Sequence, residues 1–255
     1  MTVAAFLNSS HRYDSIPDVD DVQDIIDALG TILKTNNSPV WTEPVAGTFK
    51  SPVDDDGRWF SVAVARTDVD TMSFTVKDEY GTTIKTASMD INASGSPAIE
   101  VKVYSGQYHL WIDFMRATPK NFRSGILDLS PQIQTAWSSV VYCGIDQGMD
   151  ILSTSERMDD EQSVCVPIAG YNSTMDVDMA GNVMYWPAFI RRALTNDVYK
   201  GRMYQVLIGP STIAYGTEVT VPIDTGVTAK FRAAGASPGG WNGQTTGCRY
   251  FVRAD

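Results

Sequence analysis

Apolar and polar residues alternate along most of the segment between Trp59 and Leu129. The alternation is most regular over residues 58–66, 72–77, 99–103 and 108–114. Successive side chains of a β-strand point to opposite faces of a sheet, so this period predicts antiparallel strands with one buried face and one solvated face. No nucleophile–base pair stands among these strands. We therefore expect the segment to form a scaffold or a binding surface.

A single helix is predicted before these strands. Pro17-Asp18 supplies a start signal with Asp18 as N-cap, and further acidic residues follow where the helix dipole favours negative charge. Apolar residues recur at three- and four-residue spacing from Val19 to Leu33. We expect this amphipathic helix to pack on the sheet. Packing against the same helix of a neighbouring copy is the alternative.

Turn signals divide the alternating segment into hairpins. Residues 67–70, 80–81 and 105–107 each contain glycine or acidic residues of the kind that joins paired strands. Together with the helix they predict an α+β protein that is predominantly antiparallel β, with sandwich- or barrel-like sheets. The helix and these strands form the first predicted region, residues 1–145.

The pattern changes after about Ser130. Shorter strands are expected over residues 140–142, 164–168, 183–186, 203–208, 218–223, 230–232 and 249–253. A short helix is expected over residues 187–194, and loops rich in glycine and serine separate the strands. Residues 146–255 are thus predicted to be a loop-rich β region, either a second domain or part of the first.

Composition restricts the class of protein. The 255 residues carry a formal net charge of −10, which argues against sequence-specific nucleic-acid binding because phosphate neutralisation needs clustered Lys and Arg. No apolar run is long enough for a membrane span, and the N-terminus lacks the pattern of a signal peptide. We therefore expect a protein that is made in the cytoplasm and does not associate with a membrane. The three cysteines form no C-x-x-C motif and are expected to be reduced thiols.

Candidate catalytic groups are few. His109 lies on the polar side of its strand and is expected to face solvent or a strand neighbour, and no G-x-S-x-G motif accompanies it. Trp111, Asp113 and Asp128 define an alternative sugar site, because aromatic platforms with carboxylates bind and cleave glycosides. Aromatic residues are also good strand formers and core residues, and we favour that interpretation. The protein is expected not to be an enzyme.

Two acidic segments are candidate calcium-binding loops. Residues 54–57 have consecutive acids, and residues 176–182 lack a third acid and a closing Glu, so neither matches an EF-hand loop. Phosphate-binding glycine motifs are also missing from the sequence. We expect no cofactor and no metal, and we interpret both segments as polar turns.

Aromatic residues gather in the predicted loops. Trp41, Trp137, Trp186 and Trp241 lie there, as does Tyr185 beside Trp186. Exposed Trp and Tyr often anchor protein interfaces, because they bury much area at little entropic cost. We expect Trp137, Trp186, Trp241 and Tyr185 to contribute to subunit interfaces.

The order of these features resembles virion structural proteins of tailed bacteriophages. The resemblance covers residues 19–145: the helix, W-T-x at residues 41–43, the acidic loop, G-R-W-F at 57–60, and the strands that include residues 108–113 and 122–130. The Gly-, Ala- and Thr-rich segment from Thr225 to Asp255 has a similar character.

The resemblance implies a role at the head–tail neck, as a collar or tail-terminator-like subunit. Such a subunit would form a homo-oligomeric ring through heterologous contacts, bind other virion proteins, and be assembled into the virion in the host bacterial cytoplasm. If it lines a DNA channel, its negative charge would reduce sticking of phosphates. The resemblance supplies no catalytic residue. A capsid decoration or baseplate subunit and a carbohydrate-binding or glycoside-active β-protein are the alternatives.

Overall fold

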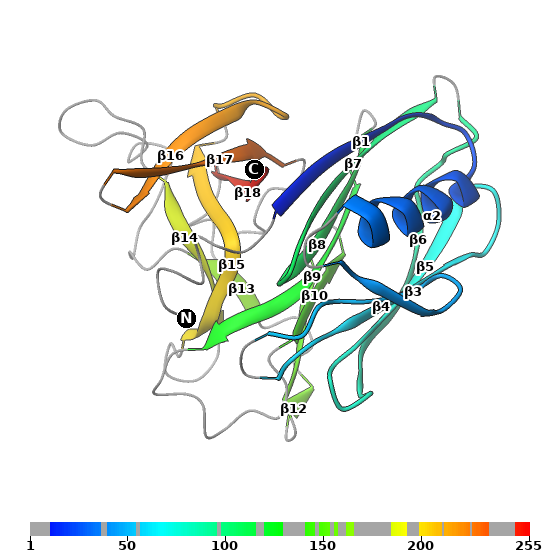
Figure 1. Ribbon diagram of the computed structural model, residues 1–255, viewed down its shortest axis with the longest axis horizontal. Helices are drawn as coiled ribbons and strands as arrows, with labels where there is room; N and C mark the ends of the chain where they lie inside the picture. Colours follow the sequence, from blue (N-terminus) through cyan, green and yellow to red (C-terminus); the bar gives the residue numbers. More distant parts are fainter. Residues whose placement is uncertain are drawn as a thin grey trace.

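Over the residues that the structure describes, the chain folds into two antiparallel sheets and one α-helix. The computed structural model describes residues 11–36, 40–54, 57–95, 98–115, 120–129, 141–145, 148–153, 156–157, 162–165, 185–192, 199–210, 212–224, 226–234 and 248–255. Within them the arrangement is mostly antiparallel strands with one α-helix near the N-terminus (Figure 1), which confirms the predicted fold class. No helix in the described ranges is long and apolar enough to cross a membrane.

The smaller sheet contains five strands in sequence order. They are β2 (Thr42–Val45), β3 (Thr48–Lys50), β4 (Ser61–Arg66), β5 (Thr71–Lys77) and β6 (Thr83–Asp90). The predicted hairpin turns at residues 67–70 and 80–81 join β4 to β5 and β5 to β6, which confirms both turns. In β5 buried side chains alternate with partly exposed ones, as the two-residue period predicts.

The larger sheet contains thirteen strands and extends through both halves of the chain. Its main path runs β1-β7-β8-β9-β15-β18-β17-β16, with the remaining strands attached to β9 and β15. Their bounds are β1 (His11–Val19), β7 (Ile99–Gly106), β8 (His109–Met115), β9 (Lys120–Leu129), β10 (Val141–Ile145), β11 (Gly148–Ser153), β12 (Glu156–Arg157), β13 (Gln162–Cys165), β14 (Trp186–Arg192), β15 (Tyr199–Pro210), β16 (Glu218–Asp224), β17 (Val227–Ala233) and β18 (Cys248–Arg253). Strand pairing therefore crosses residue 145, because β9 is hydrogen-bonded to β15.

The helix begins later than predicted. Residues Pro17 and Asp18 lie in β1, where the pairing register shifts between Ile16 and Val19 and Asp18 adopts a φ of 53°. Asp tolerates this left-handed conformation better than most residues do, so the expected start signal is a strand irregularity. The helix α2 (Val22–Thr31) has Asp21 as its N-cap, with the Asp21 side chain accepting from the Gln23 backbone N–H. A π-helical segment, η1 (Ile32–Asn36), continues it.

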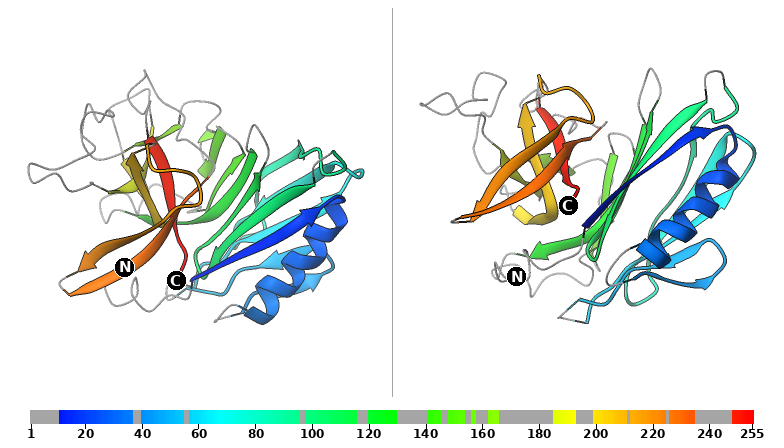
Figure 2. Two further views of the ribbon diagram at one scale, coloured as in Figure 1. Left: turned by 90° about the horizontal axis from the view of Figure 1, so that it is seen from above. Right: turned by 45° about the horizontal axis from the view of Figure 1, so that its top comes forward.

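The helix packs on the sheets of its own subunit, as predicted. It contacts β1 of the larger sheet and β4 of the smaller one, and it lies along one side of the sandwich that these sheets form (Figure 2). Val22, Ile25 and Leu29 are fully buried in a core that both sheets share. Phe74 of β5 stacks on Phe122 of β9 at 4.3 Å between ring centroids, which joins the two sheets across this core.

Trp41, interpreted above as a loop aromatic, belongs to this first core. Its side chain is 1% exposed, its indole N–H donates to the Gly106 carbonyl at 3.1 Å, and Phe60 meets it edge-on. The indole thus ties the segment before β2 to the β7–β8 hairpin. It is a structural residue and forms no part of an exposed interface.

Strands β8 and β9 bury both faces, which the sequence interpretation did not foresee. Leu110, Ile112 and Phe114 point into the first core, whereas Trp111 belongs to a second core on the opposite face. The side chains that complete this second core come mainly from β15 and β18, such as Val206 and Tyr250. The expectation of a solvated face was wrong for β8 and β9, because strands from much later in the chain cover it.

Residues 187–192 of the helix predicted over residues 187–194 belong to the strand β14, and residues 193–194 lie outside the described residues. In β14, Ile190 pairs with Val164 of β13 on one side and with Gly201 of β15 on the other. Pairing on both sides satisfies the backbone N–H and C=O groups, and this tertiary context overrides a weak local propensity for helix.

Truncation of Leu29 should show how much the helix packing contributes. The variant Leu29→Ala should lose about 2–5 kcal/mol of unfolding free energy. The substitution removes buried methyl groups, so the neighbouring core side chains lose contacts and a cavity remains. Urea unfolding followed by circular dichroism measures this loss. The exposed neighbour Gln23→Ala is the control and should change stability by roughly 0.5 kcal/mol or less. Equal effects of the two variants would contradict the packing described.

Candidate functional site

Trp111 of the alternative sugar site belongs to the second core, and Asp113 lies on the same face of β8. Trp111 and Asp113 lie two residues apart on β8, and both are fully buried. The Trp111 indole N–H donates to Asp113 Oδ1 at 2.9 Å, and the Tyr215 hydroxyl lies 3.5 Å from Oδ2. Asp113 therefore serves as a buried acceptor within the fold. It is closed off from a saccharide in solution.

A guanidinium group lies next to Trp111, because Arg123 of β9 is its partner on the neighbouring strand. Arg123 of β9 is 1% exposed, donates to the Asn121 side chain, and lies 5.6 Å and 5.5 Å from the ring centroids of Trp111 and Tyr250. Buried charges require polar or aromatic partners of this kind, because leaving water costs several kcal/mol per ion. The cluster thus supplies partners for the polar side chains on this side of β8 and β9, which would otherwise need water.

Buried phenols surround the same cluster. Desolvation raises the pKa of Tyr104, Tyr142 and Tyr215 above the ordinary value of 10, so all three stay neutral in the physiological range. Tyr142 packs against Gly125, where an added Cβ would lie 2.8 Å from the Tyr142 hydroxyl oxygen and 2.4 Å from the Tyr108 carbonyl oxygen. None of these phenols is poised for proton transfer near neutral pH.

His109 was predicted to face either solvent or a strand neighbour. The structure shows that it is buried, so the prediction that it faces solvent was wrong. Its side chain is 0% exposed on the second face of β8. Burial, with a smaller effect of the Arg253 charge, lowers the pKa of His109 to about 3. The imidazole is therefore neutral at physiological pH.

The other predicted site residues are only partly described. Asp128 lies in β9 opposite Arg202, but its side chain, like that of Trp186 in β14, is outside the described part of the structure. Trp137 and Trp241 lie outside the described residues altogether. Tyr185 packs edge-on against Phe251 at 5.0 Å and contributes to a third apolar cluster beside β15 and β17.

In the acidic segment at residues 54–57, the Gly57 backbone N–H donates to the Asp54 carbonyl at 3.0 Å, while residues 55 and 56 lie outside the described residues. Asp54 accepts hydrogen bonds from both the backbone N–H and the Nε of Arg58, each at 2.7 Å. Among the residues that the structure describes, no group of three or more His, Cys, Asp or Glu is arranged to hold a metal ion. The other acidic segment, residues 176–182, lies outside the described ranges.

The five-stranded sheet presents a face that the sequence analysis did not single out. Opposite its buried face, side chains of β3 to β6 point outward and are mostly exposed or half-exposed; we call this the outer face. Its middle consists of small uncharged residues, namely Thr48, Ala63, Ala65, Ser73, Thr75, Thr86 and Ser88. Val45 of edge strand β2, which is 67% exposed, borders it beside Thr48.

The two ends of the outer face carry opposite charges. At one end Lys50 and Lys77 flank Ser61 on neighbouring strands, and the Lys50 ammonium lies 3.8 Å from the centroid of the Trp59 ring. At the other end Asp90 pairs with Thr71, and Asp68 lies in the adjoining β4–β5 turn. The face is therefore electrically dipolar along its strands.

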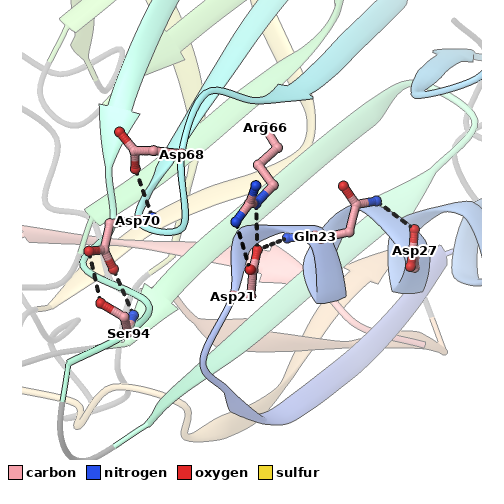
Figure 3. A network of polar contacts seen from close by, with 7 residues as sticks. All are labelled: Asp21, Gln23, Asp27, Arg66, Asp68, Asp70 and Ser94. Carbon is pink, nitrogen blue, oxygen red and sulfur yellow. Dashed lines mark hydrogen bonds and ion pairs between the residues drawn. The ribbon is translucent and has the colours of Figure 1, made fainter.

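An acidic network adjoins this negative end. Asp21 bridges to Arg66 by two hydrogen bonds of 2.9 Å and 3.0 Å, while Asp70 accepts from both the backbone and the hydroxyl of Ser94 (Figure 3). The Arg66 hydrogen bonds, followed by that of the Gln23 N–H, lower the pKa of Asp21. The network fixes the start of α2 against the end of β4.

Comparison with known proteins gives no family assignment. No protein-family model matches the chain, and a search of curated proteins found no relative. Function must therefore be argued from the residues themselves.

The pKa of His109 predicts a specific acid sensitivity. The unfolded chain takes up a proton near pH 6.5, whereas the folded chain does so only near pH 3, so stability falls as the pH is lowered through this window. In His109→Gln this contribution disappears, and the melting temperature should fall less steeply with acidification than in the wild type. Thermal unfolding at a series of pH values measures both slopes. Parallel curves throughout the window would contradict the burial of a neutral imidazole.

Asp21 should stabilise the fold only while it is ionised. Its pKa is lowered below the ordinary 3.8, so its contribution is present above that pH and is lost as the pH falls through the folded value. Asp21→Asn retains a capping oxygen but loses the Arg66 ion pair, and should lower the melting temperature at neutral pH but not in strong acid. Asp24→Asn, in the same helical turn, is the control and should have the smaller effect.

Proposed function

We propose that this protein is a non-enzymatic structural subunit of a tailed-bacteriophage virion. The observation that carries the proposal is the contrast between its two polar regions. Asp113, Arg123 and His109 are enclosed in the second core, while the outer face of the five-stranded sheet is left open and uncharged in its middle. Such a distribution suits a protein that acts through its surfaces, since a catalytic group must reach its substrate.

The proposed position is the head–tail neck, as a ring-forming collar or tail-terminator-like subunit. The sequence resemblance supports this position, and a rigid two-sheet scaffold suits a subunit that repeats around an axis through heterologous contacts. Other virion proteins would be its further partners. Strands β2 and β6, at the edges of the smaller sheet, carry backbone groups that a neighbouring strand can pair with.

The charge of the protein fits a role beside DNA without binding to it. The formal net charge is −10, and acidic residues such as Asp21 and Asp70 lie near one end of the sandwich (Figure 3). If such a surface faces the DNA channel, it repels phosphates and lets DNA pass. Sequence-specific DNA recognition has no part in the proposal.

Particle analysis tests the proposal directly. Mass spectrometry of purified virions should detect the chain at a stoichiometry of a few to some tens of copies, and cryo-electron microscopy of particles carrying a tagged chain should place it at the neck. Density at the capsid surface or the baseplate would support those alternatives. A chain that never co-purifies with particles would overturn the virion assignment.

A further inference from the structure

The outer face combines small side chains in its middle with charged side chains at its ends. No side chain in its middle is larger than Thr, and the Thr75 and Thr86 hydroxyls lie 3.1 Å apart, bonded across neighbouring strands. Charged side chains of opposite sign stand only toward the ends of the strands. A uniformly acidic or basic partner would be repelled at one of these ends.

We propose that the outer face binds the outer face of a second copy of this chain about a two-fold axis. The inference deepens the proposed function, because it names one partner of the subunit. A two-fold contact is isologous and cannot close a ring. It therefore acts in addition to the heterologous ring contacts, by joining subunits in pairs.

The charges select one orientation of the axis. A two-fold axis parallel to the strands would place Lys77 over its own counterpart and repel it. An axis in the plane of the face and perpendicular to the strands reverses the strand direction, so the Lys77 end of one copy lies over the Asp68 and Asp90 end of the other. Two sets of opposite charges then meet, one at each end of the contact.

The small side chains permit close approach but limit the strength of the contact. The four strands β3 to β6, spaced about 4.8 Å apart and between 3 and 8 residues long, cover about 400 Å² on each copy. A stable complex usually buries about 800 Å² on each partner, so the isolated pair should be weak and reversible. The contact gains strength when other interfaces hold the copies together.

A charge exchange tests the pairing on the purified full-length chain. Sedimentation over a range of concentrations should show reversible dimers that weaken as salt is raised. Lys77→Glu alone and Asp90→Lys alone should each weaken dimerisation by about tenfold, since each places like charges opposite one another. The double variant Lys77→Glu with Asp90→Lys should restore it, because the reversed charges are again complementary.

A steric variant checks the same surface independently. Thr75→Arg places a long charged side chain in the middle of the outer face and should abolish dimers. Thr220→Arg, at an exposed position on β16, adds the same charge elsewhere and should leave dimerisation intact. Circular dichroism establishes that each variant is folded.

The inference and the proposed function fail in different ways. A folded wild-type chain that stays monomeric at every concentration and salt, or dimers that persist unchanged in Thr75→Arg, would overturn the two-fold contact. Neither result would remove the chain from virions, which particle analysis detects. Conversely, dimers with the expected charge response would stand even if the chain were never found in particles.

Discussion

Burial of both faces of strands β8 and β9 is the constraint on which the rest of the structure depends. On these strands, apolar side chains at alternate positions fill the first core. The side chains between them face the second core, so any polar groups among them need partners inside the protein. The Trp111–Asp113 hydrogen bond and the contact of Arg123 with the Trp111 and Tyr250 rings meet that requirement. These residues are consequently committed to holding β15 and β18 against the central strands.

The same constraint explains which parts of the fold could be predicted from sequence. In β5 the alternation of side chains predicts exposure correctly, because one face of this sheet is open. In β8 the strand itself was predicted, but the burial of His109 was not. The strands that cover His109 and Asp113 follow many residues later, and local periodicity carries no information about them. Likewise, no local signal reveals that β13 and β15 pair with both sides of β14.

The start of the helix illustrates a competition between similar signals. Asp18 and Asp21 are both good N-cap residues, and Pro17 favours the earlier one. The pairing of Val19 with Ile99 extends β1 past Asp18, so Asp21 becomes the N-cap.

The outer face could not be found from the sequence for a related reason. Ala63, Ser73 and Thr75 look ordinary in sequence, and only the strand register brings them together with Lys77 and Asp90 at opposite ends of one surface.

Charge placement links this surface to assembly. Repulsion among many acids keeps a subunit soluble at the high local concentration that assembly demands, but it also opposes contact between copies. A contact between copies therefore needs a patch where this repulsion is absent or is reversed. The middle of the outer face is uncharged, and its basic end at Lys50 and Lys77 offers the positive charge that an otherwise acidic copy can bind. In the proposed two-fold contact, charge complementarity is confined to one oriented face, so the association is expected to be both weak and specific.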